Sequence, residues 1–329
     1  MCEVAVVTTG FFDGVHLGHR HVLETVVSSA RERGEEAIVV TFWPHPRAVL
    51  QQDAREFRLL SSLEEKKALL LAAGIDRVEV LPFTRAFAAM TAREYLQLLV
   101  DRFGASLVVM GYDNRIGSDK KTAEELEAFC SRNPSSLRSS SLPTSLRAVG
   151  PLPFMKPRTA TGSGEQNASG SGNVSPKTGI FGDANLSSTV IRKALEAGKV
   201  EGANAMLGYS YGLYGVVVAG NRLGRTIGFP TANMQLYEPL KLVPGNGVYA
   251  VEVEVLGARY RGMCNIGTRP TVGGTTRTIE THILDFDQDI YGLPIQLRFL
   301  RRVRDERKFP SLDALKEQLE EDRRICRTL

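Results

Sequence analysis

The feature that most constrains this chain is a regular alternation of short apolar runs and longer helical segments in its first third. Strands are predicted at VAVV (4–7), AIVVTF (37–42), VEVLPF (78–83) and SLVVMG (106–111). Helices are predicted between them, at 19–34, 61–75 and 91–104, from their apolar spacing and their Ser/Thr starts and Gly ends. Strands that alternate with helices pair in parallel. We therefore expect a doubly wound α/β domain with its ligands at the carboxyl ends of the strands.

The composition changes abruptly at residues 130–185. This stretch is rich in Ser, Gly, Pro and Asn and shows neither a helical nor a strand period. Segments of this kind bury too little apolar surface to fold, so we expect a disordered insertion. Order is expected to resume at LSSTVIRKALEAG (186–198), where Ser187 or Ser188 can cap a helix.

The last third has a strand-rich pattern without intervening helices. Its runs are YGLYGVVVAG (211–220), GVYAVEVEVLG (247–257), RYRGMCNIG (259–267), TIETHIL (278–284) and PIQLRFLRRV (294–303). Glycine and proline turns separate them, which predicts a small antiparallel barrel or sandwich. A closing helix over 311–329 is expected, with Leu312, Leu315 and Leu319 on its apolar stripe.

Composition limits the partners. At 329 residues the chain is long enough for two ordinary domains. Its 41 basic and 37 acidic residues are interspersed and leave a net charge of +4, which does not indicate a nucleic-acid partner. No apolar window is long enough for a membrane span, and the four cysteines lack CxxC spacing, so we expect a cytoplasmic protein without a membrane partner. The sequence does not indicate an oligomeric state.

The turn after the first predicted strand reads GFFDGVHLGHRH (10–21). A glycine-bearing turn that enters a helix can direct backbone N–H groups at a phosphate, and imidazoles can stabilise charge that develops there. The alternative is a purely structural turn with two surface histidines. A zinc site is disfavoured, because His16, His19 and His21 lack further ligands at suitable spacing.

GFFDGVHLGH resembles the HxGH signature of the nucleotidyltransferase superfamily. With TFWPHPR and LPFTRAFAAMTAREYL it resembles the adenylyltransferase half of bifunctional riboflavin kinase/FAD synthetases. GRTIGFPTAN (224–233), NIGTRPTVGG (265–274), ETHILDFDQDIYG (280–292) and RDERKF (304–309) resemble the riboflavin kinase half.

This resemblance implies four segments. Residues 1–129 would form a Rossmann-like FMN adenylyltransferase domain, 130–185 the insertion, 186–207 the end of that domain, and 208–329 a riboflavin kinase β-barrel with a C-terminal helix. In the family, the segment that 130–185 replaces is shorter and completes the sheet with a helix and a strand. Either a flexible insert takes its place or a reading-frame disturbance has scrambled it.

The resemblance also implies roles for the histidine turn and the second nucleotide motif. His16 and His19 would stabilise the transition state on the α-phosphate of ATP. The residues implied in ATP binding are Gly10, Asp13, Gly18, Ser188, Thr189 and Arg192. The motif at 188–192 could equally be an ordinary capped helix with a solvent-facing arginine.

Flavin contacts are implied for His45, in the turn WPHPR, and for Asp113, in the loop GYDNRIG. The family usually has aromatic residues where this loop has Asn114 and Ile116. The two prolines that flank His45 could also serve only to stiffen the turn.

In the second half, the implied reaction is the phosphorylation of riboflavin by ATP. The 5′-hydroxyl of riboflavin must lose its proton in this reaction, so the site requires a general base and a metal ion. Glu280 matches the position of the family's base. Thr231 and Asn233 offer oxygen ligands suited to Mg²⁺. Gly224 and Gly228 would let backbone amides reach the ATP phosphates, and Arg304 and Glu306 match a segment near the flavin.

The resulting hypothesis is a Mg²⁺-dependent bifunctional transferase, with riboflavin, FMN and ATP as its small-molecule substrates. Two rivals stay open. One is a riboflavin kinase whose first domain is inactive, and the other is a flavin-binding protein without turnover. Another HxGH enzyme would account for the first half only.

Overall fold

The computed structural model describes residues 4–50, 57–132, 138–139, 142–143, 145–150, 186–220, 223–271 and 274–329. Two compact units emerge from their contacts. The first comprises residues 1–152 and 238–242, and the second comprises 153–237 and 243–329. None of the helices described is both long and apolar enough to cross a bilayer.

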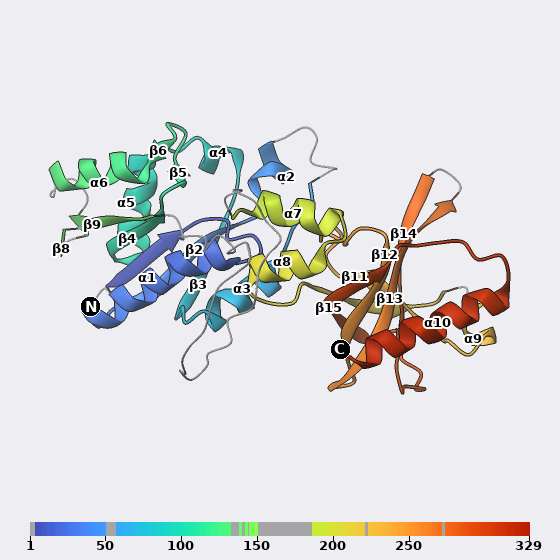
Figure 1. The fold of residues 1–329 in the computed structure, drawn as a ribbon. Helices are drawn as coiled ribbons and strands as arrows, with labels where there is room; N and C mark the ends of the chain where they lie inside the picture. Colours follow the sequence, from blue (N-terminus) through green and yellow to red (C-terminus); the bar gives the residue numbers. More distant parts are fainter. Residues whose placement is uncertain are drawn as a thin grey trace, which may run out of the picture. The chain divides into compact units, whose positions relative to one another are not determined.

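The first unit contains a five-stranded parallel sheet in the order β3-β2-β1-β4-β9 (Figure 1). Its strands are β1 (Ala5–Thr9), β2 (Glu36–Trp43), β3 (Arg77–Pro82), β4 (Ala105–Gly111) and β9 (Ser145–Val149). Its helices are α1 (Leu17–Arg33), α2 (Pro46–Leu50), α3 (Leu63–Ala72), α4 (Arg85–Ala88), α5 (Ala92–Phe103) and α6 (Ala123–Arg132). Short pairs β5 (Arg115–Ile116) with β6 (Lys121–Thr122), and β7 (Arg138–Ser139) with β8 (Leu142–Pro143), lie outside this sheet.

Both faces of the sheet are covered, as a doubly wound fold requires. Along β1, Ala5 and Val7 join a core with α5 and α6, whereas Val6 joins a separate core with α1 and α3. The period of two along a strand sends successive side chains to opposite faces, so β1 supplies both cores. The predicted α/β fold is confirmed.

The predicted caps are also confirmed, although α1 begins at Leu17 rather than at residue 19 and α3 ends at Ala72 rather than at residue 75. Ser62 and Glu65 form a capping box at the start of α3, and Thr91 and Glu94 form one at α5. Helix α1 ends at Gly34, whose φ of 65° is left-handed and free of strain only in glycine.

Strand β9 departs from the expectation for 130–185. Residues 145–149 pair in parallel with β4, and Leu146 and Val149 are buried in the two cores of the sheet. The predicted insertion without regular structure is therefore wrong for these five residues, for β7 and β8, and for residues 130–132 at the end of α6. Two apolar side chains in a polar, Ser-rich stretch gave too weak a period to reveal the strand. Residues 151–185 lie outside the described part of the chain.

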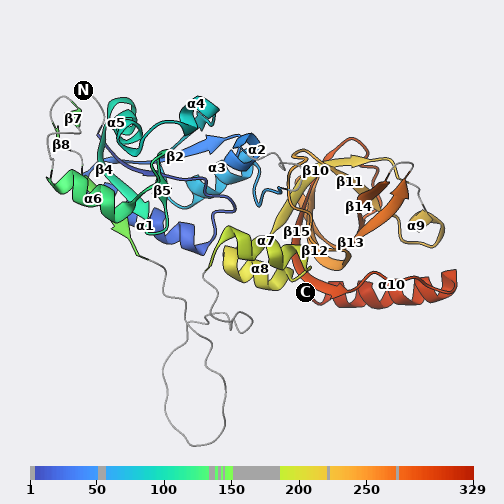
Figure 2. The same ribbon diagram turned by 90° about the horizontal axis from the view of Figure 1, so that it is seen from above.

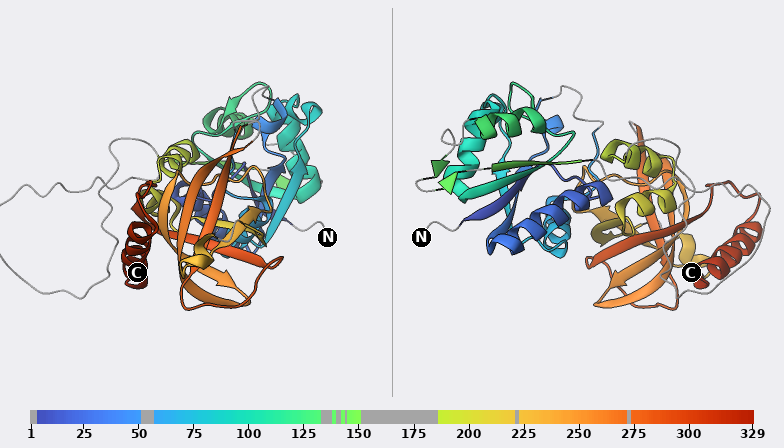
Figure 3. Two further views of the ribbon diagram at one scale, coloured as in Figure 1. Left: turned by 90° about the vertical axis from the view of Figure 1, so that its right-hand side faces the viewer. Right: turned by 60° about the vertical axis from the view of Figure 1, so that its left-hand side comes forward.

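The second unit is built on a closed antiparallel barrel (Figure 3). Its strand order is β10-β11-β14-β13-β12-β15. Its strands are β10 (Gly212–Val218), β11 (Ala232–Leu236), β12 (Gly247–Val255), β13 (Ala258–Thr271), β14 (Gly274–Ile283) and β15 (Pro294–Arg304). Its helices are α7 (Ser188–Glu196), α8 (Val200–Leu207), α9 (Leu223–Thr226) and α10 (Leu312–Arg327). Of the two predicted alternatives, a barrel and a sandwich, the structure confirms the barrel.

Helix α10 lies along the outside of the barrel, against β13 and β12 (Figure 2). Leu319 and Cys326 pack there, but Leu312 is 59% exposed, so its predicted place on the apolar stripe is wrong. The buried stripe continues toward the C-terminus through Asp322 and Cys326 rather than back through the first turn.

Candidate active sites

The histidine turn joins β1 to α1. His16 is the N-cap of α1, and its Nδ1 accepts a hydrogen bond from the backbone N–H of His19 at 3.3 Å. The two imidazole rings are stacked, with centroids 3.7 Å apart and planes 15° from parallel. The structure therefore brings both predicted histidines together at the positive end of a helix, where an anion is favoured.

The backbone before His16 is strained. Phe12 and Val15 have φ values of 47° and 37°, in the left-handed region that costs energy for residues other than glycine. The carboxylate of Asp13, between them, accepts hydrogen bonds from the backbone N–H groups of Leu60 and Ser61, each at 3.0 Å. Asp13 thus anchors the turn to the loop before α3, and its contact with ATP stays a prediction.

His19 lies in an environment that disfavours its charged form. Burial lowers the pKa of His19 well below its ordinary value, and the neighbouring His16 and Lys66 lower it further. Because His16 accepts through Nδ1, its neutral imidazole carries the proton on Nε2 and can donate there.

Lys66 is a buried lysine that was not among the site residues predicted from the sequence. Its Nζ donates to the carbonyl of Phe11 at 3.2 Å and to Thr41 Oγ1 at 3.0 Å, and so ties together the carboxyl ends of β1 and β2. Burial lowers its pKa to about 8, although the negative charge of Asp13 acts in the opposite direction.

Beside the turn, an aromatic cavity of about 460 Å³ opens at the ends of the parallel strands. Phe11, Phe42 and Phe83 line it, with ring centroids 5.1–6.0 Å apart. Each of these phenylalanines lies at or just beyond the carboxyl end of β1, β2 or β3. An aromatic residue near the end of three neighbouring strands was the sequence signal that could have revealed the cavity. Sequence reasoning missed it.

The same cavity has a polar edge. Thr9 Oγ1 and the hydroxyl of Tyr95 are 2.5 Å apart, and Asn114 Nδ2 donates to the carbonyl of Thr9 at 3.4 Å. All three residues line the cavity. Ile116, from the same loop as Asn114, is also part of its wall.

The two predicted flavin residues of this domain are placed differently. The ring of His45 lies 5.1 Å from Phe11 and 4.4 Å from Phe57, at the margin of the cavity. Asp113 is exposed and does not line the cavity, whereas its neighbour Asn114 does. The flavin contacts of both remain predictions.

The second nucleotide motif begins α7. Ser187 is the N-cap and accepts from the N–H of Val190 at 3.4 Å, which confirms the predicted helix start. Ser188, Thr189 and Arg192 follow on the helix, which is grouped with the second unit. Their approach to the histidine turn, and the assignment of 186–207 to the first domain, stay predictions.

In the barrel, the register brings the predicted base and a predicted metal ligand together. Asn233 on β11 lies directly opposite Glu280 on β14, and Asn265 on β13 lies opposite Glu280 on its other side. Directly opposite residues of antiparallel strands project from the same face, with Cβ atoms about 5 Å apart. Glu280 is therefore flanked by two amide side chains.

Glycines make room around this pair. A Cβ on Gly220 would lie 2.1 Å from Asn233 Nδ2, so the amide occupies the space that a side chain would need. A Cβ on Gly224 would lie 2.1 Å from the carbonyl oxygen of Phe229, and Gly228 has a φ of 84°. The segment 224–229 is thus a tight turn that only glycine permits at these positions.

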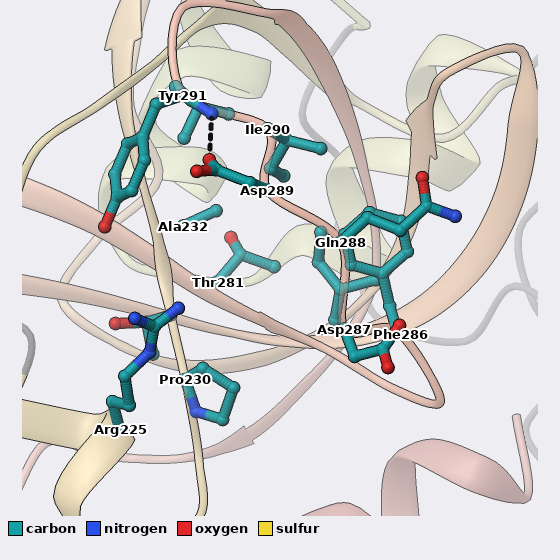
Figure 4. A pocket seen from close by; sticks show the side chains of 13 residues that line it. Arg225, Pro230, Ala232, Thr281, Phe286, Asp287, Gln288, Asp289, Ile290 and Tyr291 are labelled. Carbon is teal, nitrogen blue, oxygen red and sulfur yellow. Dashed lines mark hydrogen bonds between the residues drawn. The ribbon is translucent and has the colours of Figure 1, made fainter.

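A cavity of about 260 Å³ adjoins this turn (Figure 4). Thr231 and Arg225 line it together with Asp287, Asp289 and Tyr291 from the loop after β14. The carboxylate of Asp289 accepts from the N–H of Tyr291 at 3.1 Å, which orders that loop. Sequence reasoning did not select this loop, although it belongs to the ETHILDFDQDIYG motif.

Arg304 and Glu306 have structural partners. Arg304 pairs with Asp322 of α10 at 2.8 Å, and the Asp322 side chain has no exposed surface. Glu306 accepts from Asn246 Nδ2 at 3.5 Å and lies where a Cβ on Gly267 would be. The ion pair fastens α10 to the barrel, and the flavin contacts of both residues stay predictions.

Comparisons with known proteins agree with this two-domain architecture. The family model for FAD synthetase matches residues 2–139, and that for riboflavin kinase matches residues 207–329. The bifunctional riboflavin kinase/FMN adenylyltransferase of Bacillus subtilis is 34% identical over 97% of this chain and 90% of its own length. The protein of that name from Escherichia coli is 35% identical over 99% of this chain and 92% of its own length.

A solved structure from Streptococcus pneumoniae, titled a macrolide-efflux protein, shares 31% identity and a TM-score of 0.83 over 100% of this chain and 95% of its own. The family models and the bifunctional relatives cover the histidine turn and the Asn233–Glu280 pair alike. The chain belongs to the family of bifunctional riboflavin kinase/FMN adenylyltransferases.

Proposed function

We propose that this chain makes FAD from riboflavin in two steps, each on its own domain. The barrel phosphorylates riboflavin to FMN, and the α/β domain transfers AMP from ATP to FMN with release of pyrophosphate. The observation that carries this proposal is the similarity to bifunctional relatives over about nine-tenths of their length, which includes both sites.

For adenylyl transfer, a phosphate oxygen of FMN attacks the α-phosphorus of ATP, and the bond from that phosphorus to the pyrophosphate oxygen breaks. A phosphate monoester is largely ionised at neutral pH, since its second pKa is about 6, and so needs no general base. The site must orient the reactants and stabilise charge. We assign this task to His16 Nε2, to His19 and to the first backbone N–H groups of α1.

The aromatic cavity is our candidate for the flavin ring of FMN. Phe11, Phe42 and Phe83 offer apolar and stacking surface, and the edge formed by Thr9, Tyr95 and Asn114 offers hydrogen bonds to the polar rim of the ring. Its position beside Gly10 would bring the FMN phosphate to the histidine turn.

For the kinase step, the 5′-hydroxyl oxygen of riboflavin attacks the γ-phosphorus of ATP, its proton passes to a base, and ADP leaves. We assign the base to Glu280, whose neighbours Asn233 and Asn265 can orient its carboxylate.

The oxygen-donor set next to Glu280 suits Mg²⁺. We propose that Thr231 and Asn233 hold the ion, because Mg²⁺ prefers oxygen ligands and keeps several waters or phosphate oxygens. Gly220, against which the Asn233 amide lies, supports this assignment. When bound, the ion would neutralise charge on the ATP phosphates.

We further propose a reducing, cytoplasmic setting. Among the described residues, Cys130, Cys264 and Cys326 are buried free thiols, and thiols persist where disulfides do not form.

The proposal is tested by incubating the purified chain with riboflavin, ATP and Mg²⁺ and separating the flavins over time. Riboflavin should convert to FMN and then to FAD. FMN that accumulates without FAD, even when FMN is the substrate supplied, would favour a riboflavin kinase with an inactive first domain. Riboflavin that binds but stays unchanged would favour the flavin-binding protein without turnover.

A further inference from the structure

The first compact unit includes five residues from far along the chain, Glu238–Leu242. They run beside the loop that precedes α3. The N–H of Leu59 donates to the carbonyl of Leu240, and the N–H of Leu242 donates to the carbonyl of Leu59, both at 2.8 Å. Lys241, at the centre of this short parallel bridge, is paired with Leu59.

The side chain of Lys241 is only 6% exposed. Its Nζ donates to the carbonyl of Leu60 at 2.8 Å and to Glu65 Oε2 at 2.5 Å. The same Glu65 oxygen accepts from the N–H of Ser62 at 2.7 Å, as part of the capping box of α3. A buried ammonium is tolerated only with such partners, so Lys241 holds the Leu60 peptide and the start of α3 in one arrangement.

The peptide groups that Lys241 holds also hold the histidine turn. The N–H groups of Leu60 and Ser61 bind the carboxylate of Asp13, and Ser61 Oγ accepts from the N–H of Gly14 at 3.0 Å. Asp13 and Gly14 lie between the strained residues Phe12 and Val15. Strained backbone persists only where its surroundings hold it in place, and these hydrogen bonds provide that support.

Electrostatics favour the same arrangement. Burial lowers the pKa of Lys241, while the negative charges of Glu65, Asp13 and Glu238 act in the opposite direction. Asp13 also interacts favourably with Lys66. The carboxylate beneath the histidine turn is therefore stabilised by two buried lysines, one of which comes from residues 238–242.

We propose that Lys241 is a positioning residue for adenylyl transfer, which keeps the imidazoles of His16 and His19 in their catalytic orientation through Leu60, Ser61 and Asp13. This inference rests on the proposed function of the two histidines. It goes beyond that function, because it assigns a role at the first site to a residue in the part of the sequence that matches riboflavin kinase.

The test replaces Lys241 by Met, which keeps the length and apolar stem of the side chain, in the full chain. Misplacing catalytic groups by about 1 Å can cost about 10²-fold. We therefore expect kcat for FMN adenylylation to fall roughly 10- to 100-fold with little change in KM for FMN. Riboflavin phosphorylation in the same preparation should be unchanged. Lys67→Met is the matched control, because Lys67 lies on α3 beside exposed Glu64.

A second readout separates positioning from stability. The imidazole ¹H–¹⁵N resonances of His16 and His19 should shift in Lys241→Met and in the milder Glu65→Gln, but not in Lys67→Met. Lys241→Arg, which retains a cationic donor, should restore part of kcat. Unchanged resonances, or a kcat within about twofold of the original in folded Lys241→Met, would overturn the proposal.

The two proposals can fail separately. If the unmodified chain makes no FAD from FMN, the proposed function fails, and the imidazole resonances still decide whether Lys241 positions the histidines. If the chain makes FAD but Lys241→Met only lowers the unfolding midpoint, Lys241 is a structural anchor and the positioning role is wrong.

Discussion

At the scale of single residues, Lys66 illustrates how a buried amine can organise a site. Its hydrogen bonds to Phe11 and Thr41 join the ends of two strands that border the aromatic cavity. The ring of Trp43, the single tryptophan of the chain, lies 6.0 Å from Nζ. Tryptophan fluorescence therefore reports on the folding of this region alone.

Lys66 should make stability depend on pH in a defined direction. Its pKa is about 8 in the folded protein and 10.5 as the ordinary value, so between these pH values the unfolded chain binds more protons. The unfolding free energy contributed by Lys66 should therefore rise as the pH rises from 8 to 10.5, by at most on the order of 3 kcal/mol.

Denaturant titrations followed by Trp43 fluorescence would measure this effect. Lys66→Met should show a smaller rise over the same pH range than the unmodified chain, whereas Lys67→Met should keep the full rise. Lys241 also has a lowered pKa, so some rise should remain in Lys66→Met. Identical pH dependence in all three proteins would show that Lys66 keeps an ordinary pKa.

At the scale of secondary-structure elements, β9 completes the sheet that supports the histidine turn. It covers the open edge of β4, and Leu146 and Val149 extend the two cores on opposite faces. The residues before it are Ser-rich, yet its apolar side chains suffice because the neighbouring strand supplies the backbone hydrogen bonds.

Leu146→Asp should destabilise the first unit by about 2–5 kcal/mol, because it removes apolar contacts and buries a carboxylate. The Trp43 unfolding transition should move to lower denaturant, while riboflavin phosphorylation persists. Arg147→Asp, at the next and exposed position of the same strand, is the control and should leave the transition nearly unchanged. Equal effects of the two substitutions would mean that Leu146 is not buried in solution.

At the scale of the whole molecule, each compact unit has its own hydrophobic core. The sheet has two, built on its opposite faces, and the barrel has another that includes Phe229, Met263 and Cys326. Because each unit has its own core, a substitution in one unit can abolish the activity of that unit and leave the other unit folded and active.

Two single substitutions should divide the activities. Glu280→Ala should lower FMN formation by at least about 100-fold and leave FMN-to-FAD conversion intact, because it removes only the base of the kinase step. His19→Ala should have the reverse effect. Flavin chromatography with riboflavin or FMN as substrate measures both steps. A folded variant in which either change silences both steps would contradict the assignment of separate sites.

The sequence by itself determined those features of the protein that are encoded by residues close together in the chain. The apolar period of the strands and the capping residues Ser62, Thr91 and Gly34 predicted the α/β domain and the caps of three helix ends. The turn around His16 and His19 was evident because the whole motif lies within ten residues. These features need no knowledge of distant contacts, since local propensity and periodicity are properties of short segments.

The tertiary structure alone decided which distant residues meet. Strand register put Glu280 between Asn233 and Asn265, and sheet packing made a cavity from aromatic residues at three strand ends. Docking of α10 gave Arg304 its partner. The physical reason is that pairing, burial and hydrogen bonding between distant segments depend on how whole elements pack, and no short stretch of sequence contains that information.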